Sequence, residues 1–194
     1  DPKKMVKIPI FQDSIIIGSV IDKDLDETIS KVLQNEMKEN QGNFFSNKGG
    51  YQTRSINNSK ICDTLLKKSS EIIIENYNLT NVKISMYNLW INQNYKGNYN
   101  SPHTHPISNF SGVYYLDVSE KGGDLILFRG DRSNQMSDIP NFLKSADFKE
   151  EYHFKPLKHQ LIIFPSHLLH MVTPHFDDRP RISVSFNISI KENG

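Results

Sequence analysis

The stretch Val82-Lys83-Ile84-Ser85-Met86-Tyr87-Asn88-Leu89-Trp90-Ile91 is where the sequence changes from a helical to an alternating pattern. Every second residue from Val82 to Asn88 is expected to face the same side of a β-strand. Alternating or apolar runs of strand length then continue almost to the C-terminus. We expect these later strands over residues 111–117, 124–128, 152–156, 160–164, 170–173 and 181–190.

Upstream of residue 82, apolar residues recur at helical spacing in two segments. The first helix is expected over residues 22–40, with Asp24 or Asp26 as its N-cap, and the second is expected to begin at Asn58 or Ser59. Short strands are expected over residues 5–11 and 14–20, with an extended segment at 52–55. Two helices followed by about eight strands predict a mostly β fold with supporting α-helices, arranged as a sandwich or barrel.

Length and composition indicate one domain and exclude several function classes. The chain has 194 residues, with 23 basic and 22 acidic side chains and a net charge of +1, so nucleic acid and anionic membranes are disfavoured as partners. The single cysteine, Cys62, excludes a disulfide within the chain and fits a reducing cytoplasm. No apolar run is long enough to span a bilayer.

Residues 1–194 are therefore expected to form a single domain. Residues 1–81 would supply N-terminal strands and supporting helices, and residues 82–194 would form the β core. The polar, irregular segment 130–150 is a candidate lid, and Arg129, Arg132 and Trp90 are candidates for the entrance that it would cover.

The segment Ser101-Pro102-His103-Thr104-His105-Pro106 carries the first chemical signal. On a strand, His103 and His105 would point to the same face, so both imidazoles can bind one metal ion. His170 in Phe164-Pro165-Ser166-His167-Leu168-Leu169-His170 is a candidate third ligand. Chance proximity of histidines in a loop is the alternative explanation of the pair.

Two further segments supply polar groups that could face the same site. A strand, a turn and an antiparallel strand would bring Arg181 beside the metal, with Ser183 on the same face. An exposed surface arginine is the alternative for Arg181. Alternation sends Tyr114 and Tyr115 to opposite faces, so one hydroxyl can point into the barrel.

The order and spacing of these elements resemble the Fe(II)/2-oxoglutarate-dependent dioxygenases, and in particular the prolyl-hydroxylase-like branch with its bacterial and phage relatives. The resemblance covers about residues 89–190 and rests on these motifs: His-x-His, Tyr-Tyr-Leu, Gly-Gly-Asp-Leu-x-x-Phe, Leu-Ile-Ile-Phe-Pro-Ser-x-x-x-His and Arg-Ile-Ser-x-Ser-Phe-Asn.

The resemblance implies a double-stranded β-helix, that is, a jelly-roll or cupin-like core, with the two N-terminal helices packed on one sheet. It implies an Fe(II) site at His103, His105 and His170. It also implies that Arg181, Ser183 and Tyr115 bind 2-oxoglutarate. The implied activity is a non-haem iron hydroxylase that oxidises a peptidyl or small-molecule C–H bond with O2 and converts 2-oxoglutarate to succinate. The primary substrate is not implied.

His105 departs from the resemblance, because the family pattern has Asp or Glu at this position. We expect His105 to bind the metal, while an open coordination position and a site that binds without turnover are the alternatives. Asp117 and Asp124 are the nearest spare carboxylates, and neither occupies the matching position. A non-catalytic cupin-like binding module and a three-histidine dioxygenase that does not use 2-oxoglutarate are the competing functions.

Overall fold

The computed structural model describes residues 12–129 and 150–193. The strand expected over residues 5–11, Arg132, and all of the candidate lid except residue 150 lie outside this part of the chain. The elements run in the order β1 (Ile16–Ser19), α1 (Lys23–Glu39), β2 (Asn47–Lys48), β3 (Tyr51–Gln52), α2 (Ser59–Tyr77), β4 (Val82–Asn94), β5 (Tyr99–His103), β6 (Phe110–Asp117), β7 (Leu125–Phe128), β8 (Glu151–Phe154), β9 (Gln160–Pro165), β10 (His170–Val172) and β11 (Arg181–Glu192).

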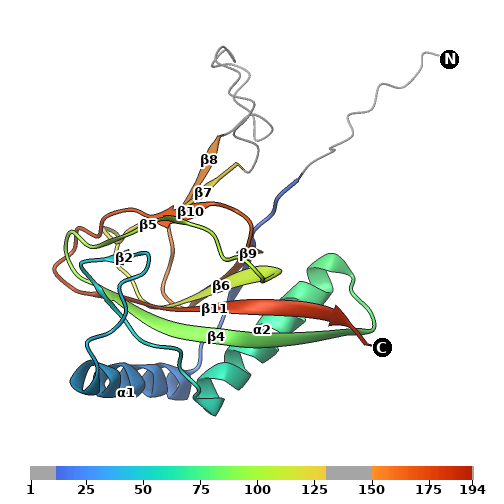
Figure 1. Ribbon diagram of the computed structural model, residues 1–194, viewed down its shortest axis with the longest axis horizontal. Helices are drawn as coiled ribbons and strands as arrows, with labels where there is room; N and C mark the ends of the chain where they lie inside the picture. The colour runs from blue at the N-terminus through green and yellow to red at the C-terminus, as the bar shows by residue number, and fades with distance from the viewer. Residues whose placement is uncertain (1–11, 130–149, 194) are drawn as a thin grey trace, which may run out of the picture.

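The strands form two sheets, and the chain crosses between them several times. One sheet has the order β1-β9-β6-β11-β4-β3, and the other has the order β2-β5-β10-β7-β8. Figure 1 shows the second sheet above the first, α1 beneath the first and α2 running diagonally across it, and both helices pack against this first sheet. A mostly β, double-stranded β-helix core with two N-terminal helices packed on one sheet is therefore confirmed.

The arrangement of the strands corrects one local expectation. β10 and β11 lie in different sheets, so Arg181 does not reach the site through a hairpin from His170. In a jelly roll the connections cross the barrel, and hydrophobic periodicity within a strand carries no information about that crossing.

Both helices begin at polar caps. The N-cap of α1 is Asp22, whose Oδ1 accepts a hydrogen bond of 3.0 Å from the backbone N–H of Leu25, so the expectation of Asp24 or Asp26 was wrong. Those two carboxylates lie in the first turn, where they interact favourably with the helix dipole. Asn58 caps α2, as expected. Neither α1, α2 nor any other helix of the described residues is long and apolar enough to cross a membrane.

Two hydrophobic clusters hold these layers together. The larger cluster lies between the helices and the six-stranded sheet and contains the buried faces of α1 and α2. The smaller cluster includes Tyr115, Leu125 and Phe164 and lies between the two sheets. Tyr114 belongs to the larger cluster and Tyr115 to the smaller one, so the expected separation of the two tyrosines is confirmed.

A β-bulge at Tyr87 sets which face of β4 reaches the interior between the sheets. Asn88 pairs with Asn187 and Met86 pairs with Ile188, so Tyr87 is an extra residue in β4. The bulge shifts the alternation by one position, and Asn88 therefore does not continue the face of Val82 and Met86. Beyond the bulge, Leu89 and Ile91 pack in the cluster beneath the sheet, while Trp90 and Asn92 line a pocket above it.

Gly112 is required where β6 crosses the ring of Phe186. The two residues are register partners, Phe186 is fully buried, and a Cβ added at Gly112 would overlap the ring. We expect Gly112→Ala to lower the free energy of unfolding by about 1–3 kcal/mol, measured by urea denaturation.

Gly18→Ala is the matched control, since its Cβ would lie 3.6 Å from Ile72 Cδ1 in ordinary contact. A Gly112→Ala protein as stable as the Gly18→Ala protein would contradict the packing described for Phe186.

Candidate metal and co-substrate site

Three imidazoles meet between the two sheets. His103 ends β5 and is the direct register partner of His170 in β10, whereas His105 lies just beyond the end of β5. Their ligand atoms all lie within 4.8 Å of one another. A metal bound at about 2.1 Å by three nitrogens needs these atoms about 3 Å apart, so shifts on the order of 1 Å would complete the site.

No carboxylate of the described residues belongs to this cluster, and Asp117 and Asp124 lie outside it. Two hydrogen bonds fix the backbone of His105. The N–H of His105 donates to Ser166 O at 3.1 Å, and Ser108 Oγ donates to His105 O at 3.1 Å. The His-x-His pair therefore faces one point, although only its first member is in the strand.

Hydrogen bonds fix the ring orientation of two of the three imidazoles. His103 Nδ1 lies 2.7 Å from Ser101 O, and His170 Nδ1 lies 2.9 Å from Leu168 O. A carbonyl oxygen can only accept, so each Nδ1 carries the proton and each Nε2 keeps a lone pair. This tautomer leaves Nε2 available to a metal, and the carbonyl orients the ring.

Burial keeps all three rings neutral. It lowers the pKa of His105 to about 4 and the pKa of His170 to about 3, with the neighbouring imidazoles adding to the effect. The pKa of His103 is also lowered, mainly by burial. Metal binding at neutral pH therefore requires no deprotonation of these ligands.

The metal-free protein should lose stability as the pH falls from about 7 to about 5. In this range the unfolded chain binds protons at imidazoles with an ordinary pKa of 6.5, whereas the folded chain keeps these three neutral until the pH approaches about 4 and about 3 for His105 and His170. The unfolded state thus binds more protons, and its free energy falls relative to the folded state.

Urea midpoints across this pH range test the prediction. His105→Asn should reduce the slope, because it removes one of the buried imidazoles that the unfolded chain protonates in this range. A midpoint that does not change with pH would contradict the lowered pKa values.

At the other end of the same pocket lies Arg181, which is only 2 % exposed. Its guanidinium carbon is 5.1 Å from the centroid of the Tyr115 ring. Within the described residues Arg181 has no carboxylate within 4.0 Å, and its buried Nε has no hydrogen-bond partner. Burial lowers the pKa of Arg181, with the Tyr115 hydroxyl opposing the shift. A buried cation without a counter-ion is unfavourable, so this end of the pocket suits an anion.

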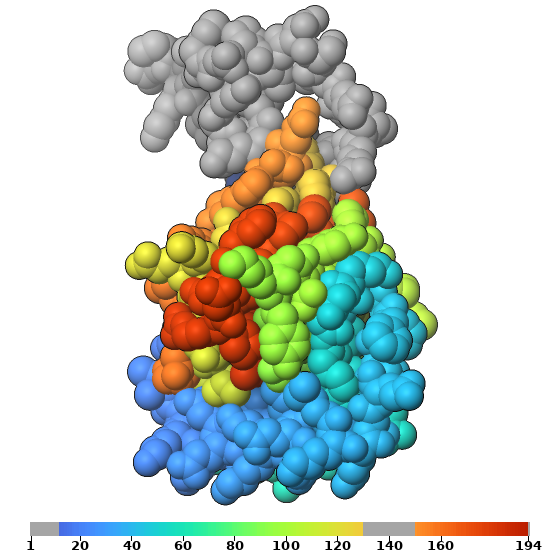
Figure 2. Space-filling model, turned by 90° about the vertical axis from the view of Figure 1, so that its left-hand side faces the viewer, coloured from blue at the N-terminus to red at the C-terminus, as the bar shows by residue number. Residues whose placement is uncertain are grey.

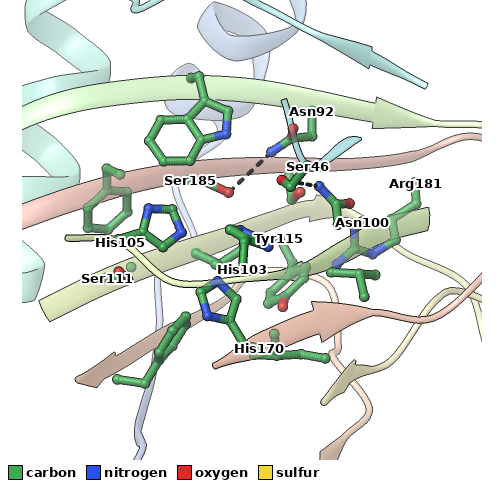
Figure 3. A pocket seen from close by; sticks show the side chains of 18 residues that line it. Ser46, Asn92, Asn100, His103, His105, Ser111, Tyr115, His170, Arg181 and Ser185 are labelled. Carbon is green, nitrogen blue, oxygen red and sulfur yellow. Dashed lines mark hydrogen bonds between the residues drawn. The ribbon is translucent and has the colours of Figure 1, made fainter. Parts of the chain in front are cut away.

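The pocket joins the two ends, and its empty volume is about 480 Å³, part of it open to solvent. Figure 3 shows the three imidazoles together, with Tyr115 between them and Arg181. Ser183 is the register partner of Tyr115 and shares the inner face of β11 with Arg181. Among the residues proposed from the sequence for the entrance, Trp90 lines the pocket.

Three segments lie together beyond the end of β11 that begins with Arg181. The turn between β4 and β5 bonds to the connection between β10 and β11, since Gly97 N–H donates to His175 O at 2.7 Å and His175 N–H donates to Asn98 O at 2.9 Å. The segment leading into β2 joins on the other side, where Ser101 N–H donates to Ser46 O at 2.9 Å. Figure 2 shows this end, with the turn in green between the red and cyan segments.

Sequence reasoning missed the amide side of the pocket. Asn92 Nδ2 donates to Ser185 Oγ at 3.2 Å, and Asn100 Nδ2 donates to Ser46 Oγ at 3.2 Å. A bulge between Asn100 and His103 lets both side chains of β5 face the interior. A signal for Asn92 was present, because asparagine is disfavoured inside a strand and follows Trp90 at a spacing of two.

Comparisons with known proteins agree with this geometry. The family model described as "Putative 2OG-Fe(II) oxygenase" matches residues 88–187, just over half of the chain. The chain belongs to the 2OG-Fe(II) oxygenase family. That range contains all three imidazoles of the cluster, together with Arg181, Ser183 and Tyr115. The oxygenase family uses Fe(II) and 2-oxoglutarate. No curated protein matches the sequence.

Solved structures share the fold at low sequence identity. A Pseudomonas putida prolyl-4-hydroxylase is 17 % identical with a TM-score of 0.61, over 90 % of this chain and 92 % of that chain. The viral collagen prolyl hydroxylase of Paramecium Bursaria Chlorella virus-1 is 15 % identical with a TM-score of 0.58, over 91 % and 94 %. The α-ketoglutarate-dependent epimerase SnoN from nogalamycin biosynthesis is 9 % identical with a TM-score of 0.67, over 94 % and 82 %.

The described residues fit both groups that the family uses. Two imidazoles with oriented Nε2 lone pairs and a third beside them form a nitrogen donor set of the kind that suits iron. The buried, unpaired Nε of Arg181 suits the far carboxylate of a dicarboxylate.

Proposed function

We propose that this oxygenase is a hydroxylase, with Fe(II) held by His103, His105 and His170 and 2-oxoglutarate anchored by Arg181. The observation that supports this proposal most is that a buried arginine, with no carboxylate within 4.0 Å among the described residues, shares one pocket with three neutral imidazoles. Arg181, Ser183 and Ser185 line this pocket at alternate positions of β11. A dicarboxylate bound to the metal through one end would therefore meet the guanidinium within the same pocket.

The residues of the pocket have separate roles in this proposal. Arg181 would pair with the far carboxylate, while the hydroxyls of Ser183 and Tyr115 would donate to the same group. Burial raises the pKa of Tyr115, so its hydroxyl keeps the proton that it would donate. The burial of Arg181 would keep water away from this ion pair and so strengthen it.

The chemistry itself comes from the bound groups. With Fe(II), one oxygen atom of O2 enters succinate as 2-oxoglutarate loses CO2, and the other enters a C–H bond of a peptidyl or small-molecule substrate. The protein contributes the positions of the ligands and a pocket in which the described lining carries no acidic side chain. A cytoplasmic location, suggested by the single Cys62, and a single folding unit over residues 1–194 belong to the same proposal.

Thermal stability measured without oxygen provides the test. Fe(II) and 2-oxoglutarate together should raise the melting temperature more than either alone, because the dicarboxylate would bind both the metal and Arg181. Candidate peptides and small molecules are then screened for succinate release in air. If iron binds but 2-oxoglutarate does not raise the melting temperature, 2-oxoglutarate is not the co-substrate. That result would favour a three-histidine dioxygenase.

His105→Asp tests whether this chain turns over with a weakened site. A carboxylate would add the negative charge that the imidazole lacks, so succinate release should increase if His105 binds the metal. Succinate release that is absent in both proteins, despite 2-oxoglutarate binding, would favour the non-catalytic binding module.

A further inference from the structure

The three imidazoles of the cluster are not held in the same way. His103 and His170 each donate from Nδ1 to a backbone carbonyl two residues earlier. The ring of His105 has no hydrogen bond to any residue in the described ranges. A metal-binding histidine is ordinarily oriented through the nitrogen that does not bind the metal. Something other than a hydrogen bond must therefore orient this ring.

Stacking takes the place of that hydrogen bond. The rings of Trp90 and His105 have centroids 5.6 Å apart and planes 20° apart. His105 also stacks on His170, at 5.0 Å and 12°. Trp90 and His105 both line the pocket. The His105 imidazole is therefore held by two stacked aromatic rings instead of a hydrogen bond.

Trp90 is the rigid partner in this arrangement. It lies in the middle of β4, where its register partner is Ser185 of β11. His105 lies in a connection outside the strands, two residues before Ile107, which has a φ of +76° and is 95 % exposed. A β-branched residue at positive φ is strained, so the local chain alone does not favour one conformation here. The indole supplies a fixed surface against which the His105 ring can rest.

We propose that Trp90 is a positioning residue for His105: it holds this imidazole by stacking in the orientation that binds the metal. The inference rests on the proposed metal site and adds a residue that acts on the metal through His105. Removal of the indole would let the His105 ring turn out of the cluster, while His103 and His170 stay oriented by their carbonyls. The metal would then lose its third ligand for part of the time.

Trp90 is the single tryptophan of the chain, so its fluorescence reports on this contact directly. Two arms of one experiment test the proposal, and the first uses this fluorescence. In the metal-free protein, His105→Ala should change the emission of Trp90, because the ring stacked on the indole is removed. In the second arm, Co(II) binding is followed by its visible absorption in the wild type, Trp90→Phe and Trp90→Leu.

We expect Trp90→Leu to weaken Co(II) binding about tenfold and to change the Co(II) absorption spectrum. Trp90→Phe keeps an aromatic face and should bind Co(II) within about threefold of the wild type. In a His105→Ala background, Trp90→Leu should have no further effect on Co(II) affinity. Tyr152→Leu is the control for the loss of an aromatic ring, since Tyr152 lies in β8, is 47 % exposed and does not line the pocket.

The possible failures are distinguishable. A wild type that binds no Co(II) refutes the metal site itself, and with it the positioning role. Tight Co(II) binding that Trp90→Leu leaves unchanged, or weakens equally in the His105→Ala background, overturns the role of Trp90 alone. If Trp90→Leu does not fold, the first arm decides: unchanged Trp90 emission in metal-free His105→Ala overturns the stacking.

Discussion

Arg181→Met should abolish the binding of 2-oxoglutarate and at the same time make the ligand-free protein more stable. The guanidinium is 2 % exposed and its Nε has no partner within the described residues, so in the free protein it is a buried cation that only the Tyr115 hydroxyl and the more distant Asp124 carboxylate compensate. A methionine of similar volume removes this penalty, and we expect a gain on the order of 1 kcal/mol or more in the free energy of unfolding. The same substitution leaves the far carboxylate of 2-oxoglutarate unpaired, which should weaken binding at least about 30-fold.

Calorimetric titration of 2-oxoglutarate into the protein loaded with Fe(II) under anaerobic conditions measures the first effect, and urea denaturation of the ligand-free protein measures the second. Arg179→Met is the matched control, because Arg179 lies two residues earlier with a side chain 67 % exposed and 3.8 Å from Asp177. Unchanged affinity for 2-oxoglutarate in Arg181→Met would exclude this arginine as the anchor. A large loss of stability in ligand-free Arg181→Met would contradict the expected gain from removing this buried charge.

His170→Ala should remove the metal. This ring is 4 % exposed, faces His103 across the β5–β10 pair, and has the edge of Phe164 against it at a centroid distance of 4.8 Å. Loss of a group that merely orients a ligand weakens metal binding about 10- to 100-fold, so loss of a ligand itself should exceed about 100-fold. Elemental analysis after equilibrium dialysis against Fe(II) without oxygen measures the metal content.

His167→Ala is the control for this second prediction. Its side chain is 67 % exposed and lies 3.2 Å from Asp13, three residues before His170 and outside the imidazole cluster. It should retain the metal content of the wild type, and circular dichroism establishes that both variants fold. Full metal content in a folded His170→Ala protein would contradict the assignment of this residue as a ligand.

Local sequence patterns were enough for most elements of the fold. Helical spacing predicted α1 and α2, and alternation predicted the strands that carry Tyr115, His170 and Arg181. These patterns succeed because each strand or helix buries one face, and a buried face leaves a period in the sequence. They failed for β2 and for most of β5, because these short strands contain polar residues whose partners come from distant segments.

The arrangement of the candidate site was harder to predict than the identity of its residues. His103, His105, His170, Arg181, Ser183 and Tyr115 could all be named from motif order, and the structure brings them into one pocket. The expected reason for the position of Arg181 was wrong, because β10 and β11 belong to opposite sheets. Asn92 and Asn100 were not expected, although both line the pocket beside the imidazoles.

The sequence by itself therefore determined the class of fold, the chemistry of the donor atoms and the departure at His105. The tertiary structure decided how each side chain is held. The bulge at Tyr87 turns Trp90 toward the pocket, and the crossing of the chain between sheets sets Arg181 opposite the imidazoles. Both depend on pairing between residues far apart in the chain, which leaves no local period. For that reason the stacking of Trp90 on His105, unlike the His-x-His motif itself, could be found only in the folded molecule.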